Sequence, residues 1–359
     1  MIASEILAKG VERGIITPEQ AERLRALENA GAPPELPVSP DDEQLRLIGG
    51  FSDIFVTIGL AMFLGAAGYL ARLAGGTIGL WAVVAIAAWL FAEFFTRRRR
   101  MALPSIVLLI VFAWAVFAGT AIALWTNTEP PTNYRPSPGG LFGVSMFNPA
   151  VQAISACVTV VLTALHYWRF RVPMTIAAGC GALVVATVAL ANGLAPGLSR
   201  GAQDAIIFVC GLAIFGLAMR FDMADPARLT RRTDIAFWLH LLAAPLIVHS
   251  LIDGAFDTGS KLDPGSAVAI VALFLALGVV AILIDRRALL VSGLAYAGVA
   301  FWALIRQAGV TGVTTPLTIL ALGTLVLLLS AAWKPLRAGV VRLAPSVLTR
   351  RLPQPTLSA

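Results

Sequence analysis

Long apolar runs alternate with short polar segments along most of this chain. A helix needs about 20 apolar residues to cross the roughly 30 Å hydrocarbon layer of a membrane. Lipid offers no hydrogen-bond partner to an unpaired backbone, and no run alternates as a barrel strand does, so each run predicts a transmembrane helix. Ten runs have the required length: 53–73, 77–96, 104–126, 149–168, 173–192, 204–221, 235–252, 266–284, 288–305 and 314–333. The predicted fold is an all-α, polytopic integral membrane protein with about ten transmembrane helices.

The composition supports this class. Hydrophobic residues make up 58% of the 359 residues and charged residues 13%, whereas a soluble domain has about 45–50% and roughly 25%. This balance excludes ordinary soluble enzymes, disordered chains and disulfide scaffolds. Arg strongly outnumbers Lys, and Ala, Gly and Leu dominate, which favours a bacterial source and hence the inner membrane.

The charged residues predict an orientation. With the N-terminus in the cytoplasm and ten spans, only five of the 27 Lys and Arg residues fall outside: Arg72, Arg135, Arg200, Lys261 and Arg306. An odd number of spans would put several basic loops on the wrong side. The positive-inside rule therefore predicts that both termini are cytoplasmic.

Four segments are predicted. Residues 1–31 form a cytoplasmic helical hairpin, 32–50 a Pro-rich linker and juxtamembrane helix, 51–333 the transmembrane domain, and 334–359 a basic cytoplasmic tail. In the hairpin, Thr17 and Gln20 have the spacing of a capping box. Small-residue spacings predict close helix contacts at Ala61-x-x-x-Gly65 and Gly293-x-x-x-Ala297.

The hairpin is too small to bury a core alone, so it must pack on something. The membrane domain, a second copy and a protein partner remain equal alternatives. Nucleic acid is excluded, because residues 1–47 hold nine acidic and five basic residues. The apolar residues that form the candidate docking surface are Ile6, Leu7, Val11, Leu24 and Leu27.

The segment from Gly14 to Leu24, GIITPEQAERL, resembles the opening of an uncharacterised family of bacterial multi-pass membrane proteins. These begin with a cytoplasmic helix pair of the form G-x-I-[ST]-x-E-Q-A-x-x-L. The resemblance covers about twenty residues and the general layout that follows. It implies a cytoplasmic helix pair ahead of a membrane domain, and no activity.

The seventh run, 235–252 and the residues just after it, holds the most informative polar positions. Pro245 removes the donor that the Leu241 carbonyl would use and predicts a kink. His240 precedes it, and His249 and Asp253 are four residues apart on one helical face. Together His240, Pro245, His249 and Asp253 are candidates for lining a polar cavity, since ionisable groups at membrane depth mark functional sites. His166, beside Tyr167 and Trp168, is expected at the membrane interface.

No metal-ligand spacing, phosphate loop or nucleophile elbow occurs, and no cofactor is expected. Three functions remain open. The first is a non-enzymatic membrane protein that binds a partner or itself through the hairpin. The second is a secondary transporter of a neutral or weakly polar solute, favoured by the kinked span and a faint inverted repeat between the first and sixth runs. The third is an intramembrane acyl-transfer-type enzyme that uses His249 and Asp253.

Overall fold

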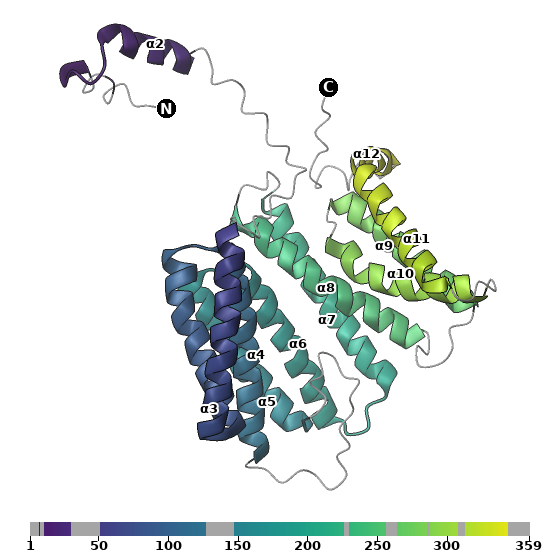
Figure 1. The fold of residues 1–359 in the computed structure, drawn as a ribbon. Coiled ribbons are helices and arrows are strands. Elements are labelled where there is room, and N and C mark those ends of the chain that lie inside the picture. Colours follow the sequence, from purple (N-terminus) through teal and green to yellow (C-terminus); the bar gives the residue numbers. More distant parts are fainter. Residues whose placement is uncertain are drawn as a thin grey trace. The chain divides into compact units, whose positions relative to one another are not determined.

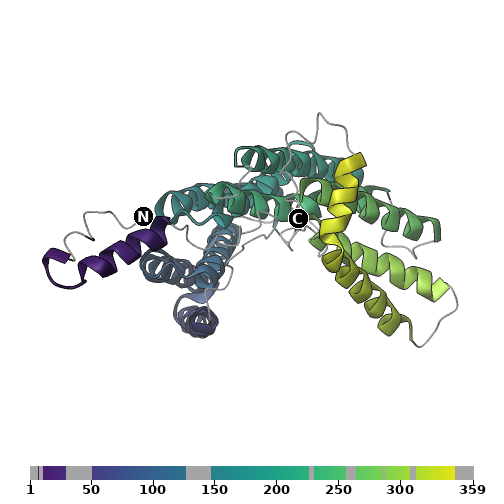
Figure 2. The same ribbon diagram turned by 90° about the horizontal axis from the view of Figure 1, so that it is seen from above.

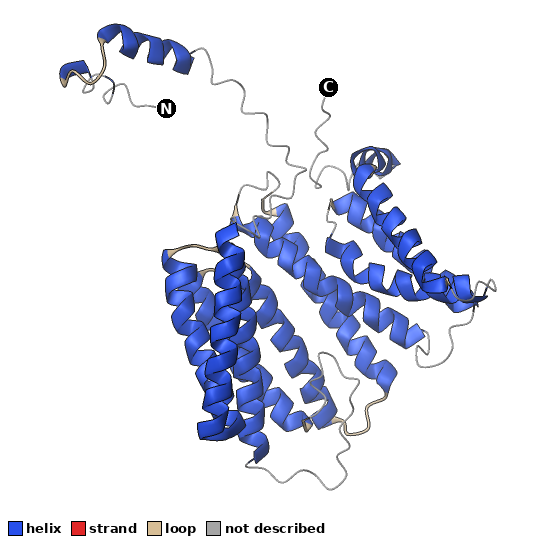
Figure 3. Cartoon of the chain, viewed as in Figure 1, coloured by secondary structure: helices blue, strands red, loops and turns tan. Residues whose placement is uncertain are grey.

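A computed structural model describes residues 7, 11–29, 51–126, 147–225, 230–255, 264–285, 288–307 and 313–343. Every regular element in these ranges is a helix (Figure 3). The chain divides into two units, residues 1–44 with 356–359 and residues 45–355, and each is considered by itself. The elements are α2 (Pro18–Asn29), α3 (Phe51–Phe91), η1 (Ala92–Arg98), α4 (Ala102–Thr126), α5 (Pro149–Phe170), α6 (Met174–Leu194), α7 (Arg200–Met223), α8 (Arg231–Ala255), α9 (Pro264–Ile284), α10 (Ala288–Gln307), α11 (Thr314–Ala331) and α12 (Trp333–Leu343).

Eight of the described helices are long and apolar enough to cross a membrane, with α3 and η1 counted as one of them. The prediction of an all-α chain with apolar spanning helices is confirmed at this level. The span boundaries predicted from hydropathy lie close to the observed ones, for example 149–168 against Pro149–Phe170. The predicted linker, most of residues 127–148 between the third and fourth apolar runs, and the end of the tail lie outside the described residues.

The first spanning element turns back on itself. Gly75 (φ −127°, ψ 17°) and Gly76 (φ 63°, ψ −160°) interrupt the helical backbone of α3. The positive φ of Gly76 is a conformation that glycine adopts without steric cost. Residues on either side of the break then meet, since the rings of Phe63 and Phe91 are 5.0 Å apart. The element from Phe51 to Arg98 is therefore a pair of antiparallel arms.

Glycines set how closely several helices approach. A Cβ added at Gly293 would lie 2.8 Å from Phe274 Cδ2 of α9, and Ala297 is fully buried, so the predicted contact at Gly293-x-x-x-Ala297 is confirmed. The prediction for Ala61-x-x-x-Gly65 is wrong, because nothing lies within 4 Å of a Cβ added at Gly65. The arms of α3 meet instead at Gly68, whose added Cβ would be 2.9 Å from Val84 Cγ2.

Helices that follow one another in sequence pack as neighbours. The helix α3 contacts α4, α5 contacts both α4 and α6, and α7 pairs closely with α8 (Figure 1). The helix α8 also contacts α6 and α10, so it joins the first group of helices to the last. The largest apolar core lies between α6, α7 and α8 and includes Val184, Ile214 and Leu239.

The basic tail begins with a short helix that crosses the others. The helix α12 is seen nearly end-on in Figure 1 and lengthwise in Figure 2. Its Trp333 donates an Nε1–H hydrogen bond of 2.9 Å to Asp285 Oδ1, at the end of α9. Arg337 of α12 lies 3.7 Å from the other carboxylate oxygen of Asp285, and all three side chains are buried. This network attaches α12 to α9.

The N-terminal unit shows the predicted cap. The backbone N–H of Gln20 donates to Thr17 Oγ1 at 3.2 Å, and the backbone N–H of Thr17 donates to Gln20 Oε1 at 2.8 Å. These reciprocal bonds start α2 at the predicted position. Leu7 is buried and Val11 half-buried, whereas Ile6 and the side chains of Leu24 and Leu27 lie outside the described residues.

Candidate functional site

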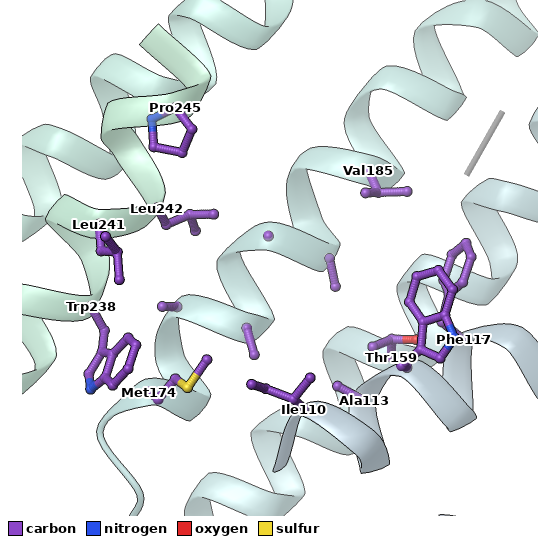
Figure 4. Close-up of a pocket in the computed structure, with 15 residues that line it drawn as sticks. Ile110, Ala113, Phe117, Thr159, Met174, Val185, Trp238, Leu241, Leu242 and Pro245 are labelled. Atoms are coloured by element: carbon purple, nitrogen blue, oxygen red, sulfur yellow. The ribbon is translucent and has the colours of Figure 1, made fainter. Parts of the chain in front are cut away.

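An apolar cavity of about 430 Å³ lies between α4, α5, α6 and α8. Figure 4 shows residues of α8 on one side, those of α4 and α5 on the other, and α6 between them. Met174 and Trp238 lie at one end, and Pro245 and Val185 at the other. This volume is within the range of small-molecule sites, about 300–1,000 Å³. The lining residues are Ile110, Ala113, Trp114, Phe117, Thr159, Met174, Ala177, Ala178, Gly181, Ala182, Val185, Trp238, Leu241, Leu242 and Pro245.

Small side chains on α6 leave the space that forms this cavity. Ala177, Ala178, Gly181 and Ala182 occupy two successive turns of the helix face that lines it. A Cβ added at Gly181 would lie 3.8 Å from Leu242 Cδ1, which is an ordinary van der Waals distance. A larger side chain at Gly181 would therefore extend into the space between α6 and α8.

The mouth of the cavity is on α4. Ile110 and Trp114 are one turn apart and are 48% and 45% exposed although both line the cavity. Trp114 is at the middle of α4, far from either helix end. The opening is therefore at the side of the helix bundle.

Few polar groups face this space. Thr159, Trp114 and Trp238 are the lining residues with polar side-chain atoms. The hydroxyl of Thr159 donates a hydrogen bond of 2.8 Å to the Ser155 carbonyl within α5, so its oxygen keeps accepting capacity. The arrangement can hold an apolar molecule with at most a few hydrogen-bonding atoms.

The helix α8 supplies one wall, because Pro245 and Leu241 both line the cavity. Proline has no N–H, so the Leu241 carbonyl lacks its usual donor from the following turn. The sequence singled out Pro245, and the structure places this residue inside α8 and at the cavity. The neighbouring Leu242 is the side chain that faces Gly181.

His240 turns toward α7 instead. Its Nε2 lies 2.9 Å from Asp222 Oδ2, and its ring meets that of Phe215 edge to face with centroids 5.3 Å apart. The imidazole is fully buried, and its Nδ1 has no hydrogen-bond partner. His240 therefore links α8 to α7 and is not among the residues that line the cavity.

The predicted pair of His249 and Asp253 is described only in part. His249 is half-buried on α8 and is not among the lining residues. The side chain of Asp253 lies outside the described residues. Among the residues described, no group of three or more His, Cys, Asp and Glu side chains lies close enough to hold a metal ion.

A second polar cluster lies where η1 meets α5. The predicted pair of Glu93 and Arg97 is present at 3.4 Å. Arg169, which is 76 residues away in sequence, donates a hydrogen bond of 2.8 Å to Glu93 Oε2, and its Nε lies 2.8 Å from Glu93 Oε1 in an ion pair. The wider turn of η1, a π-helix, is a feature often seen near functional sites. Sequence reasoning missed Arg169, because nothing local points to a partner on another helix.

The expectation that His166 lies at the membrane interface stays a prediction, and the structure shows that its imidazole faces the protein interior. His166 is 1% exposed, and its Nδ1 lies 3.3 Å from Thr175 Oγ1. Three aromatic rings surround it: Trp89 of α3, Phe112 of α4, and Phe170 one turn further along α5. Their centroids are 4.6 to 5.7 Å from that of the imidazole. These rings exclude solvent from the imidazole.

Comparison with protein-family models, with curated proteins and with solved structures finds no match for this chain.

Proposed function

We propose that this chain is a non-enzymatic bacterial inner-membrane protein that binds an apolar or weakly polar molecule inside the bilayer. The apolar cavity between α4, α5, α6 and α8 is the observation that carries this proposal. A cavity whose mouth lies at mid-helix opens into lipid when the helices span a membrane, so its ligand arrives from the bilayer. Transport of such a solute would extend this function. The proline inside the cavity-lining helix α8 favours it.

Ten spans with both termini in the cytoplasm are part of the proposal. The antiparallel arms of α3 and η1 support counting that element twice. The 20-residue helix α10, which is not among the eight candidates, supports a tenth span. With ten spans, the arginines after η1 and those before α8 fall on one side, as the positive-inside rule requires.

Saturable photolabelling tests the cavity. The full-length protein in lipid nanodiscs is irradiated with a neutral, diazirine-bearing long-chain alcohol, and labelled peptides are identified by mass spectrometry. We expect the segment 174–185 to label saturably and excess unlabelled alcohol to compete. Labelling of lipid-facing α11 should instead rise in proportion to the probe.

A matched pair of variants controls for the added side chain. Gly181→Leu places four carbons at the cavity, whereas Gly216→Leu places them on α7 at an exposed position with nothing within 4 Å of an added Cβ. The first variant should remove the saturable labelling, and the second should keep it. Labelling of 174–185 that never saturates, or that Gly181→Leu leaves unchanged, contradicts the proposal.

Docking through the N-terminal hairpin is a second candidate function, favoured by one observation. The reciprocal Thr17 and Gln20 bonds define the start of α2, and Ile15 in the preceding turn is 73% exposed. A capped helix preceded by an exposed apolar side chain suits a partner or a second copy. Deletion of residues 1–31 should then abolish an assembly that crosslinking detects in the native membrane, and an unchanged assembly removes this candidate.

A further inference from the structure

The length and depth of the cavity match one half of a bilayer. The lining residues of α6 run from Met174, its first residue, to Val185. Eleven residues of α-helix rise about 16 Å, and the hydrocarbon layer is roughly 30 Å thick. Along α6 the cavity therefore extends from the start of the helix to about its middle, which is the depth of a single leaflet.

The volume matches a single hydrocarbon chain. A methylene group is similar in size to a water molecule, whose share of the liquid is ~30 Å³. The cavity of about 430 Å³ therefore holds on the order of fifteen such groups. The chain can enter sideways, because Ile110 and Trp114 lie at the mouth and are both half-exposed.

Packing in the cavity favours a hydrocarbon chain of fitting size but does not distinguish one lipid class from another. Lipid tails are as apolar as leucine side chains, so hydrophobic transfer gives no selectivity among lipids that carry the same chains. A specific occupant needs a second interaction, and the charges at the shallow end of the cavity supply one.

Two exposed arginines lie before the lining residues of α6 and α8 at that end. Arg171 lies three residues before Met174, is exposed, and has its guanidinium 5.7 Å from the centre of the Tyr167 ring. Arg231 begins α8 seven residues before Trp238, about 10 Å along the helix. Four carboxylates lie near these ends. Glu93 is bonded to Arg169, Asp222 to His240, Asp225 accepts hydrogen bonds from Thr230 and Thr233, and Asp234 lies in the first turn of α8.

We propose that the cavity binds one acyl chain of an anionic phospholipid from the leaflet at the α6 start, with the headgroup held by Arg171 and Arg231. This inference rests on the proposed function, since it names the ligand class of the same cavity. Guanidinium groups pair with phosphate oxygens in a bidentate geometry, which suits the phosphodiester of a lipid.

Native mass spectrometry of the full-length protein tests the lipid directly. The protein is titrated with phosphatidylglycerol and with phosphatidylcholine that carry the same two chains. We expect one phosphatidylglycerol to be retained in preference to phosphatidylcholine. Gly181→Leu should lower its retention at least fivefold, and Gly216→Leu should leave it unchanged.

The headgroup contact has its own matched pair. Arg171→Gln should reduce the preference for phosphatidylglycerol roughly fivefold, the effect of one basic residue near an anionic surface. Arg306→Gln removes an arginine that is also stacked on an aromatic ring, 5.1 Å from that of Trp302, at the far end of α10. It should leave the preference unchanged. Ala178→Leu, which also fills the cavity, replaces Gly181→Leu if that variant fails to fold.

The outcomes separate the two proposals. Equal retention of both lipids, or a preference that Arg171→Gln does not alter, overturns the phospholipid assignment. If the neutral alcohol still labels 174–185 saturably in that case, the proposed cavity function stands. If the alcohol shows no saturable labelling either, both proposals fail.

Discussion

The contact between α7 and α8 at Gly211 determines how the cavity wall is held. A Cβ added at Gly211 would lie 2.9 Å from Ile247 Cγ1 and 3.1 Å from Leu246 Cβ. It would also lie 3.2 Å from the backbone nitrogen of Ile247, which cannot move unless α8 moves. Leu246 and Ile247 directly follow Pro245, so Gly211→Ala perturbs the part of α8 next to this proline.

The magnitude follows from two opposing effects. Overpacking a well-packed contact costs about 1–3 kcal/mol, and replacing glycine by alanine within a helix returns up to ~1 kcal/mol. Gly216→Ala, five residues along the same helix, meets nothing within 4 Å and keeps only the favourable effect. The two variants should therefore differ in free energy of unfolding by about 1–3 kcal/mol.

Thermal unfolding in detergent, followed by tryptophan fluorescence, measures this difference. A loss of 1 kcal/mol lowers Tm by roughly 2–4 °C in a chain of 150–250 residues. Gly211→Ala should thus melt several degrees below Gly216→Ala and should weaken the saturable labelling of 174–185. A Tm equal to or above that of Gly216→Ala would refute the reasoning that α7 and α8 meet closely at Gly211.

Three further predictions concern the polar groups and the topology. Glu93→Gln removes the charge that pairs with Arg169 and should lower stability by about 0.2–1 kcal/mol, as both groups are partly exposed. Arg97→Gln should have a smaller effect, because the distance from Arg97 to Glu93 is longer. Equal effects would contradict the assignment of Arg169 as the main partner. Asp285→Asn removes the charge that faces Arg337 in a buried network and should release α12, measured as faster proteolysis between 333 and 343. Asp53→Asn, in the first turn of α3, serves as the control. An unchanged cleavage rate would show that apolar packing alone holds α12. Reporter fusions after Gly75 and after Arg100 should report opposite sides of the membrane, because the chain reverses direction at Gly75 and Gly76. Two reporters on the same side would contradict the ten-span topology.

The helices were predictable from the sequence because the apolar runs are local. The run 104–126 and the observed Ala102–Thr126 differ by two residues at one end. The cap at Thr17 and the pair of Glu93 and Arg97 were also predictable, because both depend on residues three or four apart. Residue spacing within one helical turn is enough to predict a capping box or an i,i+4 ion pair.

The cavity was not predictable in the same way. A helix such as α6 is apolar all round, so the sequence does not distinguish Ala178, which lines the cavity, from residues that face lipid or another helix. Pro245 was singled out for its missing donor, and this local property did point to the wall. The partner of His240 was not predictable, since Asp222 is 18 residues away on another helix.

The central claim is that an apolar molecule occupies the space between α4, α5, α6 and α8. A density map of the full-length protein, in nanodiscs that retain its own lipids and with an antibody fragment bound for size, tests it most directly. The account predicts elongated density along α6 from Met174 to Val185, with a headgroup near Arg171. Helices that close this space with protein side chains, or a map in which only water-sized features fill it, would contradict the account.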